Sequence, residues 1–386
     1  MNTDFSAHNA EVKKVWESYH AGTPIRVPMI LGTNPRFTMF DHPANPRRIT
    51  FEQYLLDPEI MLTRQIEHQW WVRHHLPQDA EMGPPSDGWH VGVDFQNTYE
   101  AAWFGCRVAF RENQVPDTEP LLQNDDRKRM LFDQGIPDPF GGEWMRRNWD
   151  HYEYFQRRIE EGAAYFGYPI VGASPTALGT DGPMTVACNL RGATEFCSDL
   201  IGDPDYAQSL LSFITEATIA RIKSYRQRLE QPMTTVGWGF ADDAIEFLSE
   251  QQYKEWIYPH HKRLIEAFSE GGPNSIHLCG DATRHFRFLR DHLNIQSFDT
   301  GFPVNFTWLR EQLGPEITVA GGPSIALLLN ADPDEVRDEV RRILSSGIRA
   351  GGRFILREGN NLPPGVPLAN LEAMYAACKE FGCYGD

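Results

Sequence analysis

The chain has 386 residues, a formal net charge of −17 at pH 7, and a composition that is 41% hydrophobic and 12% aromatic. It can bury a sizeable core in one large domain or two ordinary ones. The acidic balance argues against a nucleic-acid groove, which needs clustered Lys and Arg.

Membrane insertion and secretion are not expected. No apolar run reaches the roughly 18 residues that a membrane-spanning helix needs. The N-terminal stretch MNTDFSAHNAEVKK lacks the basic segment followed by an apolar one that marks a signal peptide. The six cysteines are few and irregularly spaced, as is typical of reduced thiols. We therefore predict a cytoplasmic protein.

Helix signals recur along the chain after a predicted helical extension at 1–23. Asp203-Pro204 opens one helix, and Ser249 to Gln252 forms a capping box for another. A third helix begins after Asp332, with an apolar stripe that Gly347 ends. The strand candidates between the helices lie at 28–31, 169–174, 234–240, 275–279, 295–299, 317–322 and 353–358.

Alternation of strands with helices predicts a parallel sheet of the α/β class. Polar residues follow strand after strand, among them Asp242-Asp243, Asp299-Thr300 and Gly321-Gly322-Pro323. A (β/α)8 TIM barrel builds its active site at this end of its strands, whereas an open sheet does so only around its switch point. We expect one barrel domain over 24–382, with 100–166 as insertion-like loop material.

The stretch SIHLCGDATRH at 275–285 carries the first candidate site. His277 and Cys279 stand two apart in a predicted strand, so their side chains share a face. A zinc ion accepts both imidazole nitrogen and thiolate sulfur as ligands. The alternative is a hydrogen-bonded core histidine beside a small apolar cysteine, because a two-ligand spacing is a weak motif.

Two adjacent carboxylates follow another predicted strand. Asp242 and Asp243 could hold a metal, position a cationic substrate or share one proton. Alternatively the pair caps the next turn or helix. We expect Asp243 to cap while Asp242 faces the pocket.

A third polar group follows the last predicted strand. Arg357, Glu358, Asn360 and Asn361 occupy five positions, which exceeds what a turn needs. Arg36, after the first strand, could bind a carboxylate or phosphate, although a lone arginine is more often part of a surface ion pair.

Three stretches together resemble the uroporphyrinogen decarboxylase superfamily, which includes zinc-dependent methyltransferases that serve corrinoid proteins and coenzyme M. They are ADDAIEFLSEQQYKEWIYPHHKRLIEAF at 241–268, IHLCGDAT at 276–283 and GGRFILREGNNLPPGVPLANLEAM at 351–374. The resemblance runs from about Pro24 to Gly382 and implies a (β/α)8 barrel. Members often form homodimers.

The decarboxylase pattern itself is mostly replaced. Of its two first-strand arginines only one remains, as Arg36 in the run that also holds Asn34. Its catalytic aspartate falls at Gln96, with Asp94 two residues earlier on the same face. Its active-site tyrosine falls at Asn189. Its late histidine falls at Asn360.

The methyltransferase branch matches better. Its zinc is held by a His-x-Cys pair, here His277 and Cys279, and by a later cysteine that falls at Asn360. A neutral amide is a poor zinc ligand, so the resemblance implies a third ligand from elsewhere, with Glu358, Asp242 and Asp243 nearest along the chain. Loss of a thiolate favours activation of an oxygen over a thiol.

We therefore expect a methyltransferase in which zinc on His277, Cys279 and one carboxylate, taken as Glu358, polarises the leaving oxygen of a methoxylated or alcohol substrate. The methyl group would pass to a corrinoid partner protein. The residues expected to act in catalysis are Asp242, Asp243 and Glu358, and those expected to bind the substrate are Arg36, Asn34, Gln96, Asn189, Arg357, Asn360 and Asn361.

Two alternatives stay open. One is a metal-free decarboxylase or lyase acting on a carboxylated small molecule, with Asp242 or Asp243 as the acid. The other is a barrel that binds a ligand or partner without catalysis. The many polar groups at strand ends argue against the second, because each costs desolvation unless it is paired.

Overall fold

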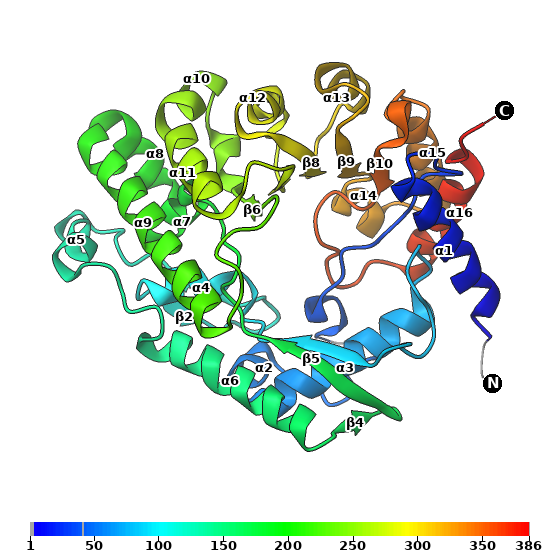
Figure 1. The fold of residues 1–386 in the computed structure, drawn as a ribbon, viewed down its shortest axis with the longest axis horizontal. Helices are drawn as coiled ribbons and strands as arrows, with labels where there is room; N and C mark the ends of the chain where they lie inside the picture. Colours follow the sequence, from blue (N-terminus) through cyan, green and yellow to red (C-terminus); the bar gives the residue numbers. More distant parts are fainter. Residues whose placement is uncertain (1–3, 41, 386) are drawn as a thin grey trace.

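A computed structural model describes residues 4–40 and 42–385. Its largest sheet has five parallel strands in the order β10-β9-β8-β7-β6, with helices around its outer face (Figure 1). The α/β class with a parallel sheet is therefore confirmed. The five strands are β6 (Gly239–Ala241), β7 (Asn274–Leu278), β8 (Ile295–Thr300), β9 (Thr318–Gly321) and β10 (Phe354–Leu356).

A second sheet lies across from the first in Figure 1. Its order is β1-β5-β4, in which β1 (Trp89–Gly92) pairs parallel with β5 (Tyr168–Ser174) and β4 (Ala164–Tyr165) pairs antiparallel. Single bridges extend the five-stranded sheet, from β10 to Met29 and from β6 to Asp181. Within the described residues, no strand pairing joins the two sheets into a closed ring.

The first half of the chain contains eight α-helices among its described residues, and three of them, α4, α5 and α6, lie in or at the edge of the region 100–166 that was expected to be an insertion. This region also carries the antiparallel pair β2 (Arg107–Ala109) and β3 (Asp117–Glu119), which joins neither larger sheet. The helices are α1 (Ser6–His20), α2 (Phe51–Leu56), α3 (Pro58–His75), α4 (Tyr99–Trp103), α5 (Met130–Gln134), α6 (Gly142–Glu160), α7 (Pro183–Arg191) and α8 (Ala193–Gly202).

The second half alternates helices with the strands of the main sheet. Its helices are α9 (Pro204–Arg228), α10 (Glu250–Gln252), α11 (Tyr258–Phe268), α12 (Thr283–Leu293), α13 (Phe306–Leu313), α14 (Ile325–Asn330), α15 (Pro333–Leu344) and α16 (Leu368–Phe381). The predicted caps are confirmed, because Asp203 caps α9 and capping boxes open α10 and α15. No described helix is long and apolar enough to cross a membrane.

Two strand predictions need correction. The stretch 28–31 makes only the bridge at Met29, and the stretch predicted at 234–240 becomes a strand only at Gly239. The remaining candidates match β5, β7, β8, β9 and β10 to within about two residues at each end, while β1 was not predicted.

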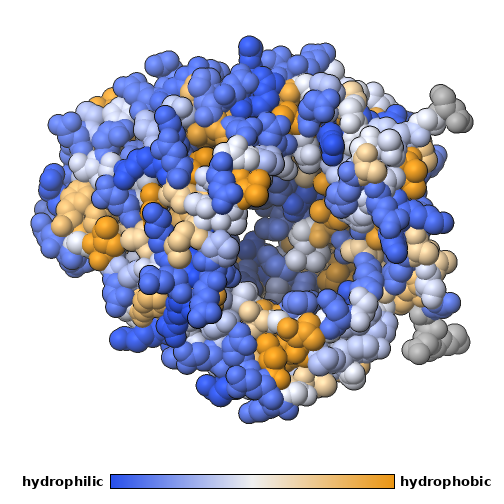
Figure 2. Space-filling view, viewed as in Figure 1, coloured by the Kyte–Doolittle hydropathy of each residue, from blue (hydrophilic) through white to orange (hydrophobic). Residues whose placement is uncertain are grey.

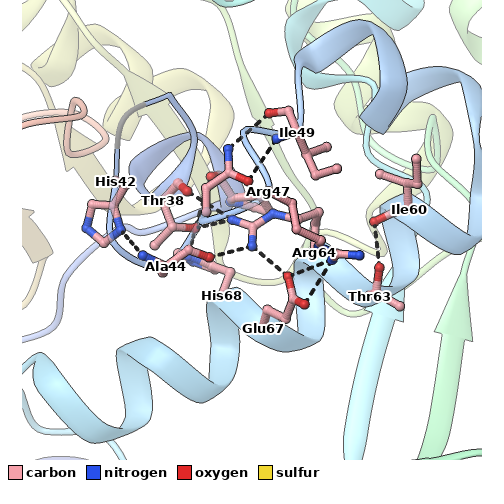
Figure 3. A network of polar contacts seen from close by, with 12 residues as sticks. Thr38, His42, Ala44, Arg47, Ile49, Ile60, Thr63, Arg64, Glu67 and His68 are labelled. Atoms are coloured by element: carbon pink, nitrogen blue, oxygen red, sulfur yellow. Dashed lines mark hydrogen bonds and ion pairs between the residues drawn. The ribbon is translucent and has the colours of Figure 1, made fainter.

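The segment before α2 is fixed against α3 by the buried residue Arg64 (Figure 3). Its guanidinium donates to the carbonyl oxygens of Thr38 (2.9 Å) and Ala44 (2.7 Å) and pairs with Glu67. Burial of a charge is tolerated when its hydrogen bonds are made in this way. Thr38 is the last residue of the turn Pro35–Thr38, which also carries Arg36, so Arg64 anchors this turn to α3.

Candidate metal centre and active site

Three side chains with metal-binding atoms meet at the ends of β6 and β7. His277 lies on β7, Cys279 follows it, and Asp243 begins the turn after β6. Their ligand atoms all lie within 4.8 Å of one another. His277 Nε2 is 2.9 Å from Cys279 Sγ, and the backbone N–H of Cys279 donates to Asp243 Oδ1 at 2.7 Å. Figure 2 shows a central hollow on one face of the molecule, with hydrophilic residues around much of it.

Asp299 orients the ring of His277. The two residues are register partners on β7 and β8, and His277 Nδ1 lies 2.7 Å from Asp299 Oδ2. Arg357 holds the same carboxylate oxygen at 2.6 Å. An imidazole that donates Nδ1–H to a carboxylate keeps its Nε2 lone pair free, which is the usual arrangement of a metal-binding histidine.

The environment shifts the pKa of both groups. Burial lowers the pKa of His277, but the hydrogen bond and charge of Asp299 outweigh it, so this pKa lies above its ordinary value. Burial raises the pKa of the Cys279 thiol, and the charge of Asp243 raises it further. A cation among these groups would reverse the effect on the thiol, because it stabilises the thiolate.

Glu358 does not join this cluster, although it was expected as a metal ligand and catalytic residue. Its side chain is fully buried, and its Oε1 accepts from Arg357 Nη2 (3.0 Å) and from the N–H of Gly32 (2.9 Å). Burial raises the pKa of Glu358, and the charge of Arg357 partly offsets this. The carboxylate that does meet His277 and Cys279 is Asp243.

Asp242 and Asp243 have exchanged their expected places. Asp242 is fully buried and accepts from the N–H groups of Met184 (3.2 Å) and Thr185 (2.7 Å) at the start of α7. It also accepts from His261 Nε2 at 2.7 Å. Asp242 is therefore the capping residue, and the expectation that it faces the pocket is wrong.

The expected substrate-binding residues near the first strand form a second polar group. Arg36 Nε donates to Gln96 Oε1 at 3.1 Å, and Gln96 Nε2 donates to Asp94 Oδ2 at 2.6 Å. Burial lowers the pKa of Arg36, and the charges of Asp94 and Cys279 oppose the shift. Asn34 accepts from the N–H of Arg36 and so caps the turn (Pro35–Thr38) that carries it.

The remaining predicted residues are three asparagines. Asn360 lies at the cluster, since its Oδ1 is 3.2 Å from Cys279 Sγ. Asn361 donates its N–H to that same oxygen at 2.7 Å. Asn189 lies half-buried on α7, the helix that Asp242 caps.

The sequence did not single out a further acidic residue near the site. Asp181 bridges to Ala241, next to Asp242, and its N–H donates to Glu100 Oε2 at 2.7 Å. Burial, with the charge of Glu100, raises the pKa of Asp181 well above its usual range. Arg221 pairs with Glu100 at 2.8 Å, and its positive charge partly offsets the negative charge of Glu100 and Asp181. These residues come from α4, a loop and α9, and no local motif joins them.

The donor set fits a divalent transition metal. Imidazole nitrogen, thiolate sulfur and carboxylate oxygen are all zinc ligands, and the carboxylate on the far side of the histidine is already in place. His277, Cys279 and Asp243 are therefore the residues that could hold a metal ion.

Comparison with known proteins gives partial matches. The chain is 26% identical over 202 residues to the methylated-thiol–coenzyme M methyltransferase of Methanosarcina mazei, covering 51% of each chain. It is 26% identical over 201 residues to the uroporphyrinogen decarboxylase of Salinispora tropica, covering 50% of this chain and 52% of that one. The matched region thus spans about half the length of these curated relatives.

A solved structure, titled methyltransferase from Methanosarcina mazei, shares the fold. It superposes with a TM-score of 0.61 at 18% identity, covering 96% of this chain and 98% of the other. The family model for uroporphyrinogen decarboxylase (URO-D) matches residues 91–381, which include β5 to β10 and every residue of the metal-binding cluster. The chain belongs to the uroporphyrinogen decarboxylase (URO-D) family.

Proposed function

We propose that this protein is a methyltransferase that uses a metal ion to take a methyl group from a small oxygen-containing donor. The observation that carries the proposal is the convergence of His277, Cys279 and Asp243 within 4.8 Å at the ends of adjacent strands. Similarity over half its length to a methylated-thiol–coenzyme M methyltransferase supports it. We propose a (β/α)8 barrel as the architecture, in which Met29, β1 and β5 to β10 supply the ring and the strand ends supply the site.

Each residue of the site has a proposed task. His277, Cys279 and Asp243 hold the metal, which we propose is zinc, and Asp299 keeps His277 in the tautomer that leaves Nε2 free. The metal would supply Lewis acidity toward the donor oxygen. Arg36 would hold an anionic group of the substrate, because its guanidinium is hydrogen-bonded through Nε to the neutral amide of Gln96 and keeps its charge for a ligand.

The number of thiolate ligands indicates which kind of substrate atom the metal centre would bind. A centre with one sulfur and one carboxylate ligand is harder than a centre with two thiolates, and it favours an oxygen ligand over sulfur. We therefore propose a methoxylated or alcohol donor. The methyl acceptor would be the cobalt of a separate corrinoid protein that docks over the strand ends.

Elemental analysis of the purified chain tests the metal centre first. We expect about one zinc per chain in the wild type and a loss of most of it in His277→Ala. His90→Ala is the matched control, because His90 is exposed and its ring pairs with the exposed side chain of Asp87. A wild-type chain that stays free of metal after zinc is supplied would contradict the proposal.

Methyl transfer is tested separately, with a methoxylated aromatic compound as the donor and free cob(I)alamin as the acceptor. Methylcobalamin has its own absorption spectrum, so its formation can be followed directly. We expect formation with the wild type and none with Cys279→Ser. Carbon dioxide release from a carboxylated substrate by the metal-free chain would instead favour a decarboxylase.

A further inference from the structure

Asn360 directs its amide oxygen at the metal-binding cluster. It follows β10, and its Oδ1 lies 3.2 Å from Cys279 Sγ. The orientation of the amide is fixed, because the same oxygen accepts the backbone N–H of Asn361 at 2.7 Å. Rotating the amide by half a turn would place its NH₂ group against that N–H, so the oxygen must face the thiol.

Cys279 Sγ lies at the centre of a group of possible metal donors. His277 Nε2 is 2.9 Å from the sulfur, Asn360 Oδ1 is 3.2 Å from it, and a carboxylate oxygen of Asp243 lies within 4.8 Å. The amide oxygen is therefore nearly as close to the sulfur as the imidazole nitrogen that the metal centre uses. A cation held by His277, Cys279 and Asp243 would have this oxygen beside it.

Building on the metal-assisted function above, we propose that the amide oxygen of Asn360 is the fourth protein donor to the metal. The centre then has one nitrogen, one sulfur and two oxygen donors. Donor atoms around a tetrahedral zinc stand roughly 3.5 Å apart, so the 2.9 and 3.2 Å spacings at Cys279 Sγ need only a small expansion. A neutral amide would be the weakest of the four donors, so Asn360 would be the residue whose place a substrate oxygen could take.

The backbone of Asn360 carries strain that this role accounts for. Its φ is 99°, outside the regions that residues with a Cβ adopt readily. Such strain persists where the surroundings enforce it, and it is concentrated at functional sites. Glycine would relieve the strain and remove the oxygen in one substitution. The backbone and the metal therefore place opposite demands on this position.

Cobalt(II) reconstitution of the full chain gives a readout that does not depend on turnover. Its thiolate charge-transfer band counts sulfur ligands, and its visible bands report the coordination geometry. The variants are Asn360→Gly, which removes the oxygen, and Asn360→Cys, which replaces it with a thiolate. Asn113→Gly is the control, because Asn113 also has positive φ (55°) and is exposed far along the chain from the cluster.

We expect Asn360→Gly to bind cobalt and zinc about tenfold or more weakly, with altered visible bands, while the thermal stability of the metal-free chain does not fall. Asn360→Cys should roughly double the charge-transfer intensity and tighten zinc binding. Asn113→Gly should match the wild type. Unchanged affinity and visible bands in Asn360→Gly would overturn the assignment while leaving the three-residue metal centre intact. Failure of the wild type to bind cobalt would remove that centre and the assignment with it.

Discussion

Adjacent residues with the same side chain do different work at the end of β6. Asp242 accepts hydrogen bonds from α7 and from His261 and is fully buried, whereas Asp243 faces Cys279 and is partly exposed. Tyr253 extends the buried network, because its hydroxyl lies 3.0 Å from His261 Nδ1. Asp242 therefore fixes α7 and α11 to the sheet, and Asp243 is left for the metal.

Replacing Asp242 should lower the unfolding free energy of the protein. In Asp242→Ala, His261 and two N–H groups of α7 lose their acceptor in a buried site. Removing one partner of such a network costs about 3–5 kcal/mol of unfolding free energy. Urea unfolding measures the loss. Asp281→Ala is the control, since Asp281 is exposed and its side chain accepts from the hydroxyl of the nearby Thr283. A loss under about 1 kcal/mol in Asp242→Ala would show that the network is not structural.

At this scale the sequence predicted some site residues and missed others. The i, i+2 spacing placed His277 and Cys279 on one face, and the structure brings them within 2.9 Å. It could not separate Asp242 from Asp243, because neighbours at a strand end diverge only through the backbone turn that follows. It also favoured Glu358 over Asp243, since chain position does not show that Arg357 and Gly32 already occupy that carboxylate.

At the scale of elements, the residues that follow β8 contact the backbone of the loop that carries Cys279. The N–H of Phe302 donates to the carbonyl oxygen of Cys279 at 3.3 Å. Gly301 makes this approach possible, because a Cβ there would overlap the carbonyl group of Cys279. The clash would be with backbone, which cannot swing aside as a side chain does. Gly301 thus couples the end of β8 to the position of Sγ.

A methyl group at Gly301 should displace Cys279. We expect Gly301→Ala to lose about 1–3 kcal/mol of unfolding free energy from overpacking and to bind zinc more weakly, as isothermal titration calorimetry would show. Gly202→Ala is the control, because nothing lies within 4 Å of a Cβ at Gly202, near the end of α8. Wild-type zinc affinity in Gly301→Ala would contradict the coupling.

The prediction of strands from the sequence failed at two places where side chains, instead of a neighbouring strand, make hydrogen bonds to the backbone. Gln65 on α3 pairs with both backbone polar groups of Gly92, at 2.6 and 3.0 Å, on the free edge of β1. The N–H of Met29 donates to Asp79, and that of Leu31 donates to Gln78. The periodicity of an apolar run does not show which partner its backbone will have, so 28–31 looked like a strand and β1 did not.

At the scale of the whole molecule, the contacts of Gln78 and Asp79 form a seam. They join residues 26–31, here called the first segment, to the loop that precedes β1. Asp79 lies at its centre with no exposed side-chain surface. It pairs with Arg26 at 2.6 Å through both oxygens, and it accepts from Met29 N–H (2.7 Å) and the Tyr375 hydroxyl (3.0 Å). Asp79 lies between α3 and β1, so its one carboxylate ties this loop both to Arg26 and Met29 and to α16. Figure 1 places α1 beside α16 at this side, where Glu11 pairs with Lys379.

Loss of the charge on Asp79 should open this seam. In Asp79→Asn, Arg26 keeps a 6% exposed side chain with Glu11 as its remaining carboxylate partner, at 3.0 Å, and the Val27 carbonyl oxygen at 3.2 Å. An uncompensated buried charge costs about 3–5 kcal/mol, and the pairing with Glu11 places the expected loss near the lower end of that range. Thermal unfolding measures the effect, and hydrogen exchange should show faster exchange in the first segment and α16 than in β7. The exposed pair of Arg107 with Glu119 supplies the control, and Glu119→Gln should leave the melting temperature unchanged.

The double variant Arg26→Met with Asp79→Asn should lose less unfolding free energy than the sum of the two single losses, because no unpaired charge remains. Additive losses would mean that the seam is held by the Met29 and Tyr375 bonds and not by the ion pair.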